Sequence, residues 1–363
     1  MVLLYIFAFV VLINCFYFLL FAKFSFAYSR KKENRTYSVS LIICAKNESD
    51  NLKDNIPFWL EQEYSDFEII LINDASYDDS LEIMESFAEE NSKIKIVDVE
   101  NNEAFWGSKK YALTLGIKKA QHQRLVFTDA DCKPASKKWL QEMTNHFSKN
   151  KQIVLGFGAY KKLPGILNKL IRFETFITAV QYFSYAKAGI PYMGVGRNLA
   201  YTNKVFFDNR GFMSHMNIKS GDDDLFINEA AKKENTTICF SKESFTISEP
   251  KKTWKEWVHQ KRRHISTAKH YKSKHKILLG LYFISTVSFW ILAIVSFVSL
   301  DWKIPLAMVL FRFIFQFIIF RKAATKLDQK DLLLWLPFLE LFLILFQFSI
   351  FISNSSSKPT SWK

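Results

Sequence analysis

The sequence predicts an α/β fold with a mostly parallel sheet, attached to a membrane by one N-terminal and three C-terminal apolar segments. Three observations lead to this fold class. Short β-branched and apolar runs alternate with helical patterns between residues 37 and 150, which is typical of βαβ units. Four longer apolar stretches lie outside this region. At 363 residues, the chain is long enough to bury the core of one sizeable domain in addition to them.

The alternating region gives four strands and the helices between them. The expected strands are 39–44, 68–72, 94–97 and 124–128, and the expected helices are 51–63, 78–91 and 108–121. After residue 150 the pattern becomes irregular, with a strand expected at 153–160. A Phe-rich stretch, 166–186, follows as an interfacial or acceptor-side helix. In sheets of this kind the chemistry lies at the carboxyl ends of the strands.

The four membrane segments are expected at 2–22, 277–300, 304–320 and 332–352. The first has no charge in its 21 residues and is followed by basic residues, which predicts an anchor. A cleaved signal peptide is the alternative, since Ser25-Phe-Ala27 has the small residues of a cleavage site.

The charge distribution favours a membrane protein over a nucleic-acid binder. The formal net charge is +14, but the basic residues gather beside the apolar segments, at 23–35, 261–276 and 321–330. The opposite side has only Lys303, Lys358 and Lys363. The positive-inside rule then places residues 23–276 in the cytoplasm and both termini outside, as expected of a multi-pass protein of the cell membrane.

This topology divides the chain into five parts. They are an anchor at 1–23, a cytoplasmic catalytic domain at 24–250, an interfacial basic segment at 251–276, three membrane helices at 277–352 and a short polar tail at 353–363. The four cysteines form no closely spaced pairs, so neither a disulfide framework nor a zinc site is expected.

Carboxylates follow two of the predicted strands. Asp129 and Asp131 come directly after the apolar run 125–128, and Asp74 ends an earlier strand. Two carboxylates in one crevice suit a hard divalent cation that bridges a diphosphate. Such pairs are frequent, and a solvated strand end is the alternative. By contrast, Gly156-x-Gly158 and Gly194-x-Gly196 lack the context of a dinucleotide fingerprint.

Taken in order, several motifs resemble the family-2 glycosyltransferases of the GT-A fold. The matching strings are Val39-Ser-Leu-Ile-Ile-Cys-Ala-Lys-Asn-Glu48, Ile70-Leu-Ile-Asn-Asp-Ala-Ser76, Gly107-Ser-Lys-Lys-Tyr-Ala-Leu113, Thr128-Asp-Ala-Asp131, Ser220-Gly-Asp-Asp-Asp-Leu225 and Gln260-Lys-Arg-Arg-His264. The resemblance covers residues 37–270, about two-thirds of the chain. It implies a GT-A, Rossmann-like domain in the cytoplasm.

The resemblance also implies roles for individual residues. Mg²⁺ or Mn²⁺ would bind at Asp131 with Asp129 close by, and Asp74 would contact the nucleotide base. The other donor-binding residues would be Ala45, Asn47, Glu48, Lys109, Gln260 and Arg263. An arginine offers paired donors to phosphate oxygens, although the segment 251–276 also fits a basic helix on the membrane surface. The family's usual Trp is replaced by His264.

Asp222 is the expected general base, because it precedes Leu225 by three positions as in the related pattern. Asp223 is a rival, since Gly221 stands where the family more often has Glu. The three adjacent acids could instead cap a helix at 225–233.

The expected function is a metal-dependent, inverting glycosyltransferase. It would transfer a sugar from a nucleotide sugar, by default a UDP-sugar, to a lipid-linked or membrane-embedded hydroxyl. Lipid glycosyltransferases of the ceramide or carotenoid type resemble the layout best. A processive polysaccharide synthase is the alternative, although the missing Trp and the few spans argue against it. A non-catalytic assembly module is a third reading, which the intact carboxylates disfavour.

Two charges inside the apolar segments prompt a separate hypothesis. Arg312 and Glu340 each lie about eight residues, or roughly 12 Å, from the cytoplasmic end of their segments. A lone charge at that depth is costly, so the matched depths predict an ion pair between the two segments. A substrate contact is the alternative.

Overall fold

The computed structural model describes residues 1–28, 36–100, 109–218, 220–265 and 267–356. They form two units that are each described by themselves. The sheet unit comprises Ser29–Lys161 and Gly189–Pro250, and the helical unit comprises Met1–Tyr28, Lys162–Ala188 and Lys251–Ser361.

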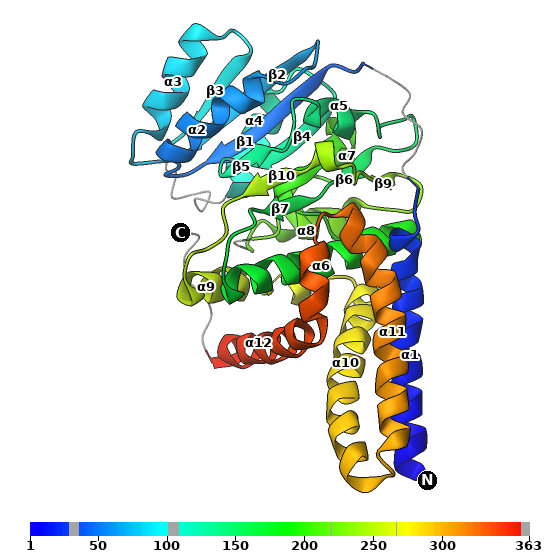
Figure 1. The fold of residues 1–363 in the computed structure, drawn as a ribbon. Coiled ribbons are helices and arrows are strands. Elements are labelled where there is room, and N and C mark those ends of the chain that lie inside the picture. The colour runs from blue at the N-terminus through cyan, green and yellow to red at the C-terminus, as the bar shows by residue number, and fades with distance from the viewer. Residues whose placement is uncertain (29–35, 101–108, 219, 266, 357–363) are drawn as a thin grey trace. The chain divides into compact units, whose positions relative to one another are not determined.

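The sheet unit is built on a seven-stranded sheet in the order β3-β2-β1-β4-β8-β6-β9 (Figure 1). Its strands are β1 (Val39–Ala45), β2 (Phe67–Asp74), β3 (Ile94–Val99), β4 (Arg124–Asp129), β6 (Ile153–Leu155), β8 (Leu199–Thr202) and β9 (Thr236–Ile238). The first four strands in that order run parallel, whereas β8 is antiparallel to both of its neighbours. The four predicted strands are thus confirmed, and the sheet is mostly parallel as predicted, with β8 as its antiparallel strand.

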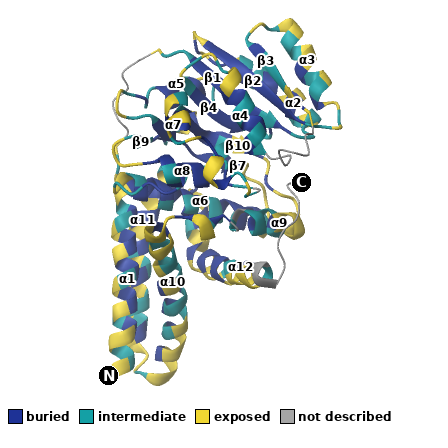
Figure 2. Ribbon diagram, turned by 180° about the vertical axis from the view of Figure 1, so that it is seen from behind, coloured by how far each residue is buried: buried dark blue, intermediate teal, exposed yellow. Residues whose placement is uncertain are grey.

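Helices alternate with the parallel strands, as the sequence predicts. They are α2 (Ser49–Leu60), α3 (Ser80–Glu90) and α4 (Lys109–Lys119), followed by α5 (Trp139–Thr144), α7 (Asn203–Asp208) and α8 (Asp224–Ala230). Both faces of the sheet are covered, and Figure 2 shows β1, β2 and β4 almost entirely buried. Near-continuous apolar strands such as 39–43 require this double burial.

The strand expected at 153–160 is wrong as a single element. The chain forms β6 and then β7 (Gly158–Tyr160), which joins β5 (Cys132–Pro134) and β10 (Thr246–Ser248) in a second, three-stranded sheet. The break falls at Gly156, where a Cβ atom would lie 2.5 Å from the Asn198 side chain. The chain turns there because the buried Asn198 amide takes the space and donates to the Phe157 carbonyl at 3.0 Å.

The helical unit contains four helices long and apolar enough to cross a membrane, which confirms the predicted apolar helices. They are α1 (Val2–Ser25), α10 (Ser273–Ser299), α11 (Lys303–Lys326) and α12 (Leu336–Ser356), the last preceded by the 3₁₀ turn η6 (Lys330–Trp335). Figure 1 shows α1, α10 and α11 side by side, whereas α12 runs across their direction. The helices α6 (Ile166–Lys187) and α9 (Trp254–Ile265) also run across it.

Inside this unit, the predicted ion pair is present. Arg312 Nη1 lies 2.8 Å from Glu340 Oε1, and the Arg312 side chain is fully buried. Asn14 Oδ1 on α1 accepts from Arg312 Nη2 at 3.0 Å, and Gln316 Nε2 donates to Glu340 at 2.5 Å. Trp290 Nε1 on α10 donates to the same carboxylate at 3.1 Å. These five residues, called the membrane polar cluster below, join α1, α10, α11 and α12. The contacts of α1 favour an anchor over a cleaved signal.

Candidate active site

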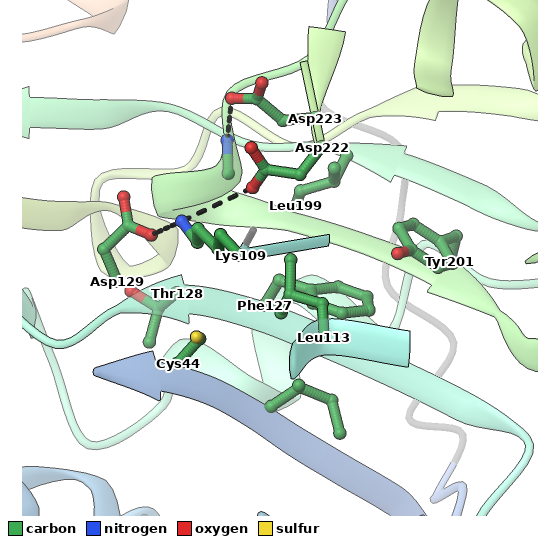
Figure 3. A pocket seen from close by; sticks show the side chains of 12 residues that line it. Cys44, Lys109, Leu113, Phe127, Thr128, Asp129, Leu199, Tyr201, Asp222 and Asp223 are labelled. Carbon is green, nitrogen blue, oxygen red and sulfur yellow. Dashed lines mark hydrogen bonds and ion pairs between the residues drawn. The ribbon is translucent and has the colours of Figure 1, made fainter. Parts of the chain in front are cut away.

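The parallel strands end at one edge of the sheet, and the predicted carboxylates gather there. Asp74 ends β2, Asp129 ends β4, and Asp222 and Asp223 precede α8. A pocket in this region is lined by residues of β1, α4, β4, β8 and the start of α8 (Figure 3). The crevice therefore follows from the topology, since parallel strands bring their carboxyl ends together.

Asp129 and Asp131 form the acid pair of the site. Ligand atoms of Asp129, Asp131 and Cys132 lie within 4.8 Å of one another, and Cys132 is buried. Burial raises the pKa of Asp131, and the carboxylates of Asp129 and Glu48 raise it further. Such crowding of negative charge suits a cation.

The donor set fits Mg²⁺ or Mn²⁺ better than a soft metal. Burial raises the pKa of the Cys132 thiol well above its ordinary value, and Asp131 and Asp129 add to the shift. The thiol therefore stays protonated, and it donates to Asp131 Oδ1 at 3.4 Å. The remaining ligands are carboxylate oxygens, which hard divalent cations prefer.

Lys109 lies between Asp129 and the candidate base Asp222, as Figure 3 shows. Its Nζ is 2.6 Å from Asp129 Oδ1 and 3.4 Å from Asp222 Oδ2. Burial alone would lower the pKa of this ammonium, but the charges of Asp129 and Asp222 raise it well above its ordinary value. Lys109 thus stays charged at the centre of the site. Gly107 and Ser108 of the same motif lie outside the described residues.

The carboxylates of Asp222 and Asp223 have different surroundings. Asp223 accepts from the backbone N–H groups of Gly196 and Asp224, each at 2.7 Å, and thereby caps α8. Burial raises the pKa of Asp223 to about 8, with contributions from Asp222 and Asp224. Asp222 instead points to Lys109 and the pocket. The capping alternative thus applies to Asp223.

The predicted donor loop joins the ends of β1 and β2. Asn47 has φ 53° and receives the Tyr77 N–H on its Oδ1 at 2.9 Å, while its own N–H donates to Ser76 Oγ at 3.0 Å. Ala45 ends β1, and the backbone N–H of Glu48 donates to Ser80 at 2.9 Å.

Asp74 is the least satisfied acid of this edge. It is 3% exposed, and its buried Oδ2 has no hydrogen-bond partner within the described chain. Burial raises the pKa of Asp74, while Lys46 and Lys109 oppose the shift. A buried acceptor without a donor costs free energy, so a ligand that donates to this oxygen would recover it.

Lys110 is a site residue that the sequence analysis missed. Its buried ammonium donates to the carbonyls of His215, Ile218 and Ser220, at 2.7, 2.8 and 2.8 Å. It therefore holds the segment that leads into Asp222. Burial lowers its pKa to about 8, against the opposing charges of nearby aspartates. Only its place beside Lys109 could have signalled this role, because its partners are backbone atoms more than 100 residues away.

The two G-x-G strings serve this site by leaving room. A Cβ at Gly158 would lie 3.0 Å from the Arg197 side chain, and a Cβ at Gly196 would lie 3.4 Å from Asp223 Oδ2, which accepts the Gly196 N–H. The Arg197 guanidinium lies over the Tyr160 ring at 4.2 Å, and its charge opposes the raised pKa of Asp131. The segment Gly194–Asn198 thus contacts the candidate acid Asp223 through the Gly196 N–H.

Gln260 and Arg263 are predicted donor-binding residues that do not belong to the sheet unit. Both lie on α9 of the helical unit, which runs beside α12 through stacked Trp257 and Phe346 rings. Their expected contact with a diphosphate stays a prediction.

Comparisons with known proteins show what this chain resembles. Residues 40–205 match the family described as glycosyl transferase family 2. A poly-β-1,6-N-acetyl-D-glucosamine synthase of Staphylococcus epidermidis is 34% identical over 102 residues, which cover 28% of this chain and 24% of that protein. A cholesterol galactosyltransferase of Borreliella burgdorferi is 39% identical over 95 residues, which cover 26% of this chain and 25% of that protein. The chain thus spans about a quarter of the length of these curated relatives.

One solved structure matches almost the whole chain. The mannosyltransferase PcManGT from Pyrobaculum calidifontis, in complex with GDP-Man and Mn²⁺, has a TM-score of 0.60 at 13% identity. The match covers 95% of this chain and 99% of that one. At this identity the likeness is one of fold, and it confirms the expected GT-A architecture.

Proposed function

Because residues 40–205 match the family described as glycosyl transferase family 2, we propose that this chain transfers a sugar from a nucleotide sugar to a hydroxyl acceptor held in the membrane. One observation carries the proposal. The acid pair, Asp74 with its unpartnered Oδ2 and the candidate base Asp222 lie at one edge of the sheet. Lys109 lies between Asp129 and Asp222, and these three residues line the pocket. Each of these groups suits a different part of a nucleotide sugar.

Asp131 and Asp129 would hold the divalent cation. When bound, Mg²⁺ or Mn²⁺ supplies positive charge that offsets the charge developing on the departing diphosphate. Lys109, already charged and beside Asp129, supplies a second positive group for the same phosphate oxygens. Gln260 and Arg263 are proposed to add further phosphate donors.

Asp222 is the proposed general base. Both oxygens of Asp223 accept backbone N–H groups, and its raised pKa keeps a proton there near neutral pH. Asp222 can take the proton of an acceptor hydroxyl as that oxygen attacks the anomeric carbon from the face opposite the diphosphate. A single base and direct displacement give inversion, with a contribution of about 10²–10⁴-fold from the base.

Asp74 is proposed to bind the base of the nucleotide. Its buried Oδ2 can accept an N–H of a uracil or guanine ring, which is why both UDP- and GDP-sugars suit this position. The loop of Ala45, Asn47 and Glu48 would line the same nucleoside.

A lipid or lipid-linked acceptor is favoured by the four apolar helices in the same chain. Similarity to a cholesterol galactosyltransferase supports this choice. The similarity to a poly-N-acetylglucosamine synthase keeps a processive synthase as the second candidate. We place the sheet unit on the cytoplasmic face of the cell membrane, where nucleotide sugars are made and where the basic flanks predict it.

The test is nucleotide release by the full-length protein in detergent. A panel of UDP- and GDP-sugars is offered with Mn²⁺ or Mg²⁺, with and without total membrane lipid, and product size is measured. We expect one donor to give lipid-stimulated release of a short glycolipid, which EDTA and Asp131→Ala abolish. Long polymers would establish the processive alternative. Absence of both nucleotide release and donor binding across the panel would refute the enzymatic proposal.

A further inference from the structure

The last apolar helix does not follow the direction of the other membrane helices. In Figure 1, α12 runs across α1, α10 and α11, although the sequence predicts a fourth crossing at 332–352. Its neighbours in the unit are mainly α9 and α6. The direction of α12 therefore follows from its packing against α9 and α6 rather than against α1, α10 and α11.

Contacts along its length show that α12 follows α9. The ring centroids of Trp254 and Phe342 are 5.7 Å apart. Trp257 stacks on Phe346 with ring centroids 4.0 Å apart and an interplanar angle of 5°. Further along, Arg262 Nη2 donates to the Ser353 carbonyl at 3.2 Å. The contacts advance in the same direction on both helices, over about 16 Å of α12.

The composition of α9 decides what orientation the pair can take. This helix has twelve residues and carries Lys255, His259, Lys261, Arg262 and Arg263. It is too short to cross a membrane, and burying its charges in acyl chains would be costly. Together with Trp254, it has the composition of a helix at the headgroup level. A helix that runs beside it for three turns must lie along the membrane as well.

The two faces of α12 agree with this placement. Leu339, Leu343, Phe346 and Ile350 are buried within the unit, whereas the opposite face exposes Leu341, Leu345, Phe348 and Phe351. Exposure of these apolar side chains to water would be unfavourable, whereas the acyl chains of a membrane would cover them. Glu340, near the start of α12, is held by the membrane polar cluster, which places the helix below the headgroups.

We propose that α12 lies in the plane of the membrane, embedded among acyl chains of the leaflet in which the C-terminal end of α1 lies, and that the chain crosses the membrane three times. Residues 357–363 are then on the same side as the sheet unit, opposite to the α10–α11 turn. Lys358 and Lys363 join the basic side, which leaves Lys303 on the other and agrees better with the positive-inside rule. This inference does not rest on the enzymatic activity.

Cysteine labelling of the full chain in intact cells tests the number of crossings. The wild-type cysteines are buried or half-buried and serve as the blank. Lys149→Cys reports the side of the sheet unit and Asp301→Cys reports the α10–α11 turn, both at exposed positions. With a membrane-impermeant maleimide, we expect Lys363→Cys to behave as Lys149→Cys and opposite to Asp301→Cys. Permeabilised cells give the full extent of labelling. Labelling of Lys363→Cys together with Asp301→Cys would overturn the proposal, and an inverted orientation of the whole protein would not.

Spin labels on the exposed face test the depth of the helix. Labels at Leu341→Cys, Leu345→Cys, Phe348→Cys and Ile352→Cys, in the protein reconstituted in vesicles, are compared by their accessibility to oxygen and to a water-soluble nickel chelate. We expect one common depth for all four. A steady change of depth from residue 341 to 352 would mean a crossing helix and would overturn the proposal.

Discussion

The same side-chain types serve opposite purposes in the two units. At the edge of the sheet, Asp74 has a buried oxygen without a partner, and Asp131 carries a raised pKa. In the membrane polar cluster, the buried Arg312 and Glu340 bind each other and three further polar side chains. A buried polar atom without a hydrogen-bond partner indicates a site where a ligand supplies the partner. A buried polar cluster whose members bind one another indicates a structural contact between helices. Substitutions should therefore affect activity in one region and stability in the other.

The largest expected effect is the loss of activity in Asp222→Asn. This change removes the proposed base but keeps its size, so nucleotide release should fall by about 10²–10⁴-fold with an unchanged melting temperature. Initial rates and thermal unfolding in detergent measure the two. Asp208→Asn removes a carboxylate from an exposed ion pair of the same unit and serves as the control. A rate within a few-fold of wild type would exclude Asp222 as the base.

The membrane polar cluster should give the reverse result. Glu340→Ala leaves Arg312 buried without its counter-charge, which typically costs about 3–5 kcal/mol of unfolding free energy. Thermal unfolding should show a large loss of stability, and the double variant with Arg312→Ala should recover part of it. Strictly additive effects of the two changes would contradict the ion pair as a coupled unit.

Asp74→Asn should weaken donor binding without harming the fold. Loss of a hydrogen bond to a charged acceptor costs about 1.5–3 kcal/mol, or roughly 10–100-fold in Kd. Calorimetric titration with UDP and GDP measures the change. Thermal stability without ligand should be maintained, since the native carboxylate has an unpartnered oxygen. Equal affinity in both proteins would place the nucleotide elsewhere.

The smallest effect concerns the pH dependence of stability. The pKa of Asp74 is raised by burial, so the folded protein binds this proton more tightly than the unfolded chain. Its contribution to stability is complete below the ordinary Asp pKa of 3.8 and is lost as pH rises through the higher folded value. Between these two values the wild type should lose stability relative to Asp74→Asn. Parallel curves of melting temperature against pH would contradict this cause.

The sequence predicted what depends on local pattern. The buried parallel strands follow from continuous apolar runs, and the pair of Arg312 and Glu340 follows from their equal depth in two apolar segments. Distant contacts were missed. Lys110 binds carbonyls that only the fold brings near, and the break at Gly156 depends on the Asn198 side chain. The direction of α12 depends on its packing against α9, and the hydropathy of α12 alone cannot predict that contact.

The chain leaves the sheet unit at Lys161 and returns to it at Gly189, so α6 interrupts the sheet unit and belongs by its packing to the helical unit. Phe176 on α6 packs against Phe320 of α11, with ring centroids 5.7 Å apart. Phe183 on α6 packs against Phe24 of α1, with ring centroids 4.9 Å apart. Removing the segments before and after residues 36–250 therefore removes the membrane helices that pack against α6, whereas α6 itself remains in the fragment. A fragment of residues 36–250 should aggregate unless α6 is replaced by a short polar linker. The segments of the two units alternate along the chain. Exchanging the sheet unit between such enzymes therefore requires four junctions rather than one.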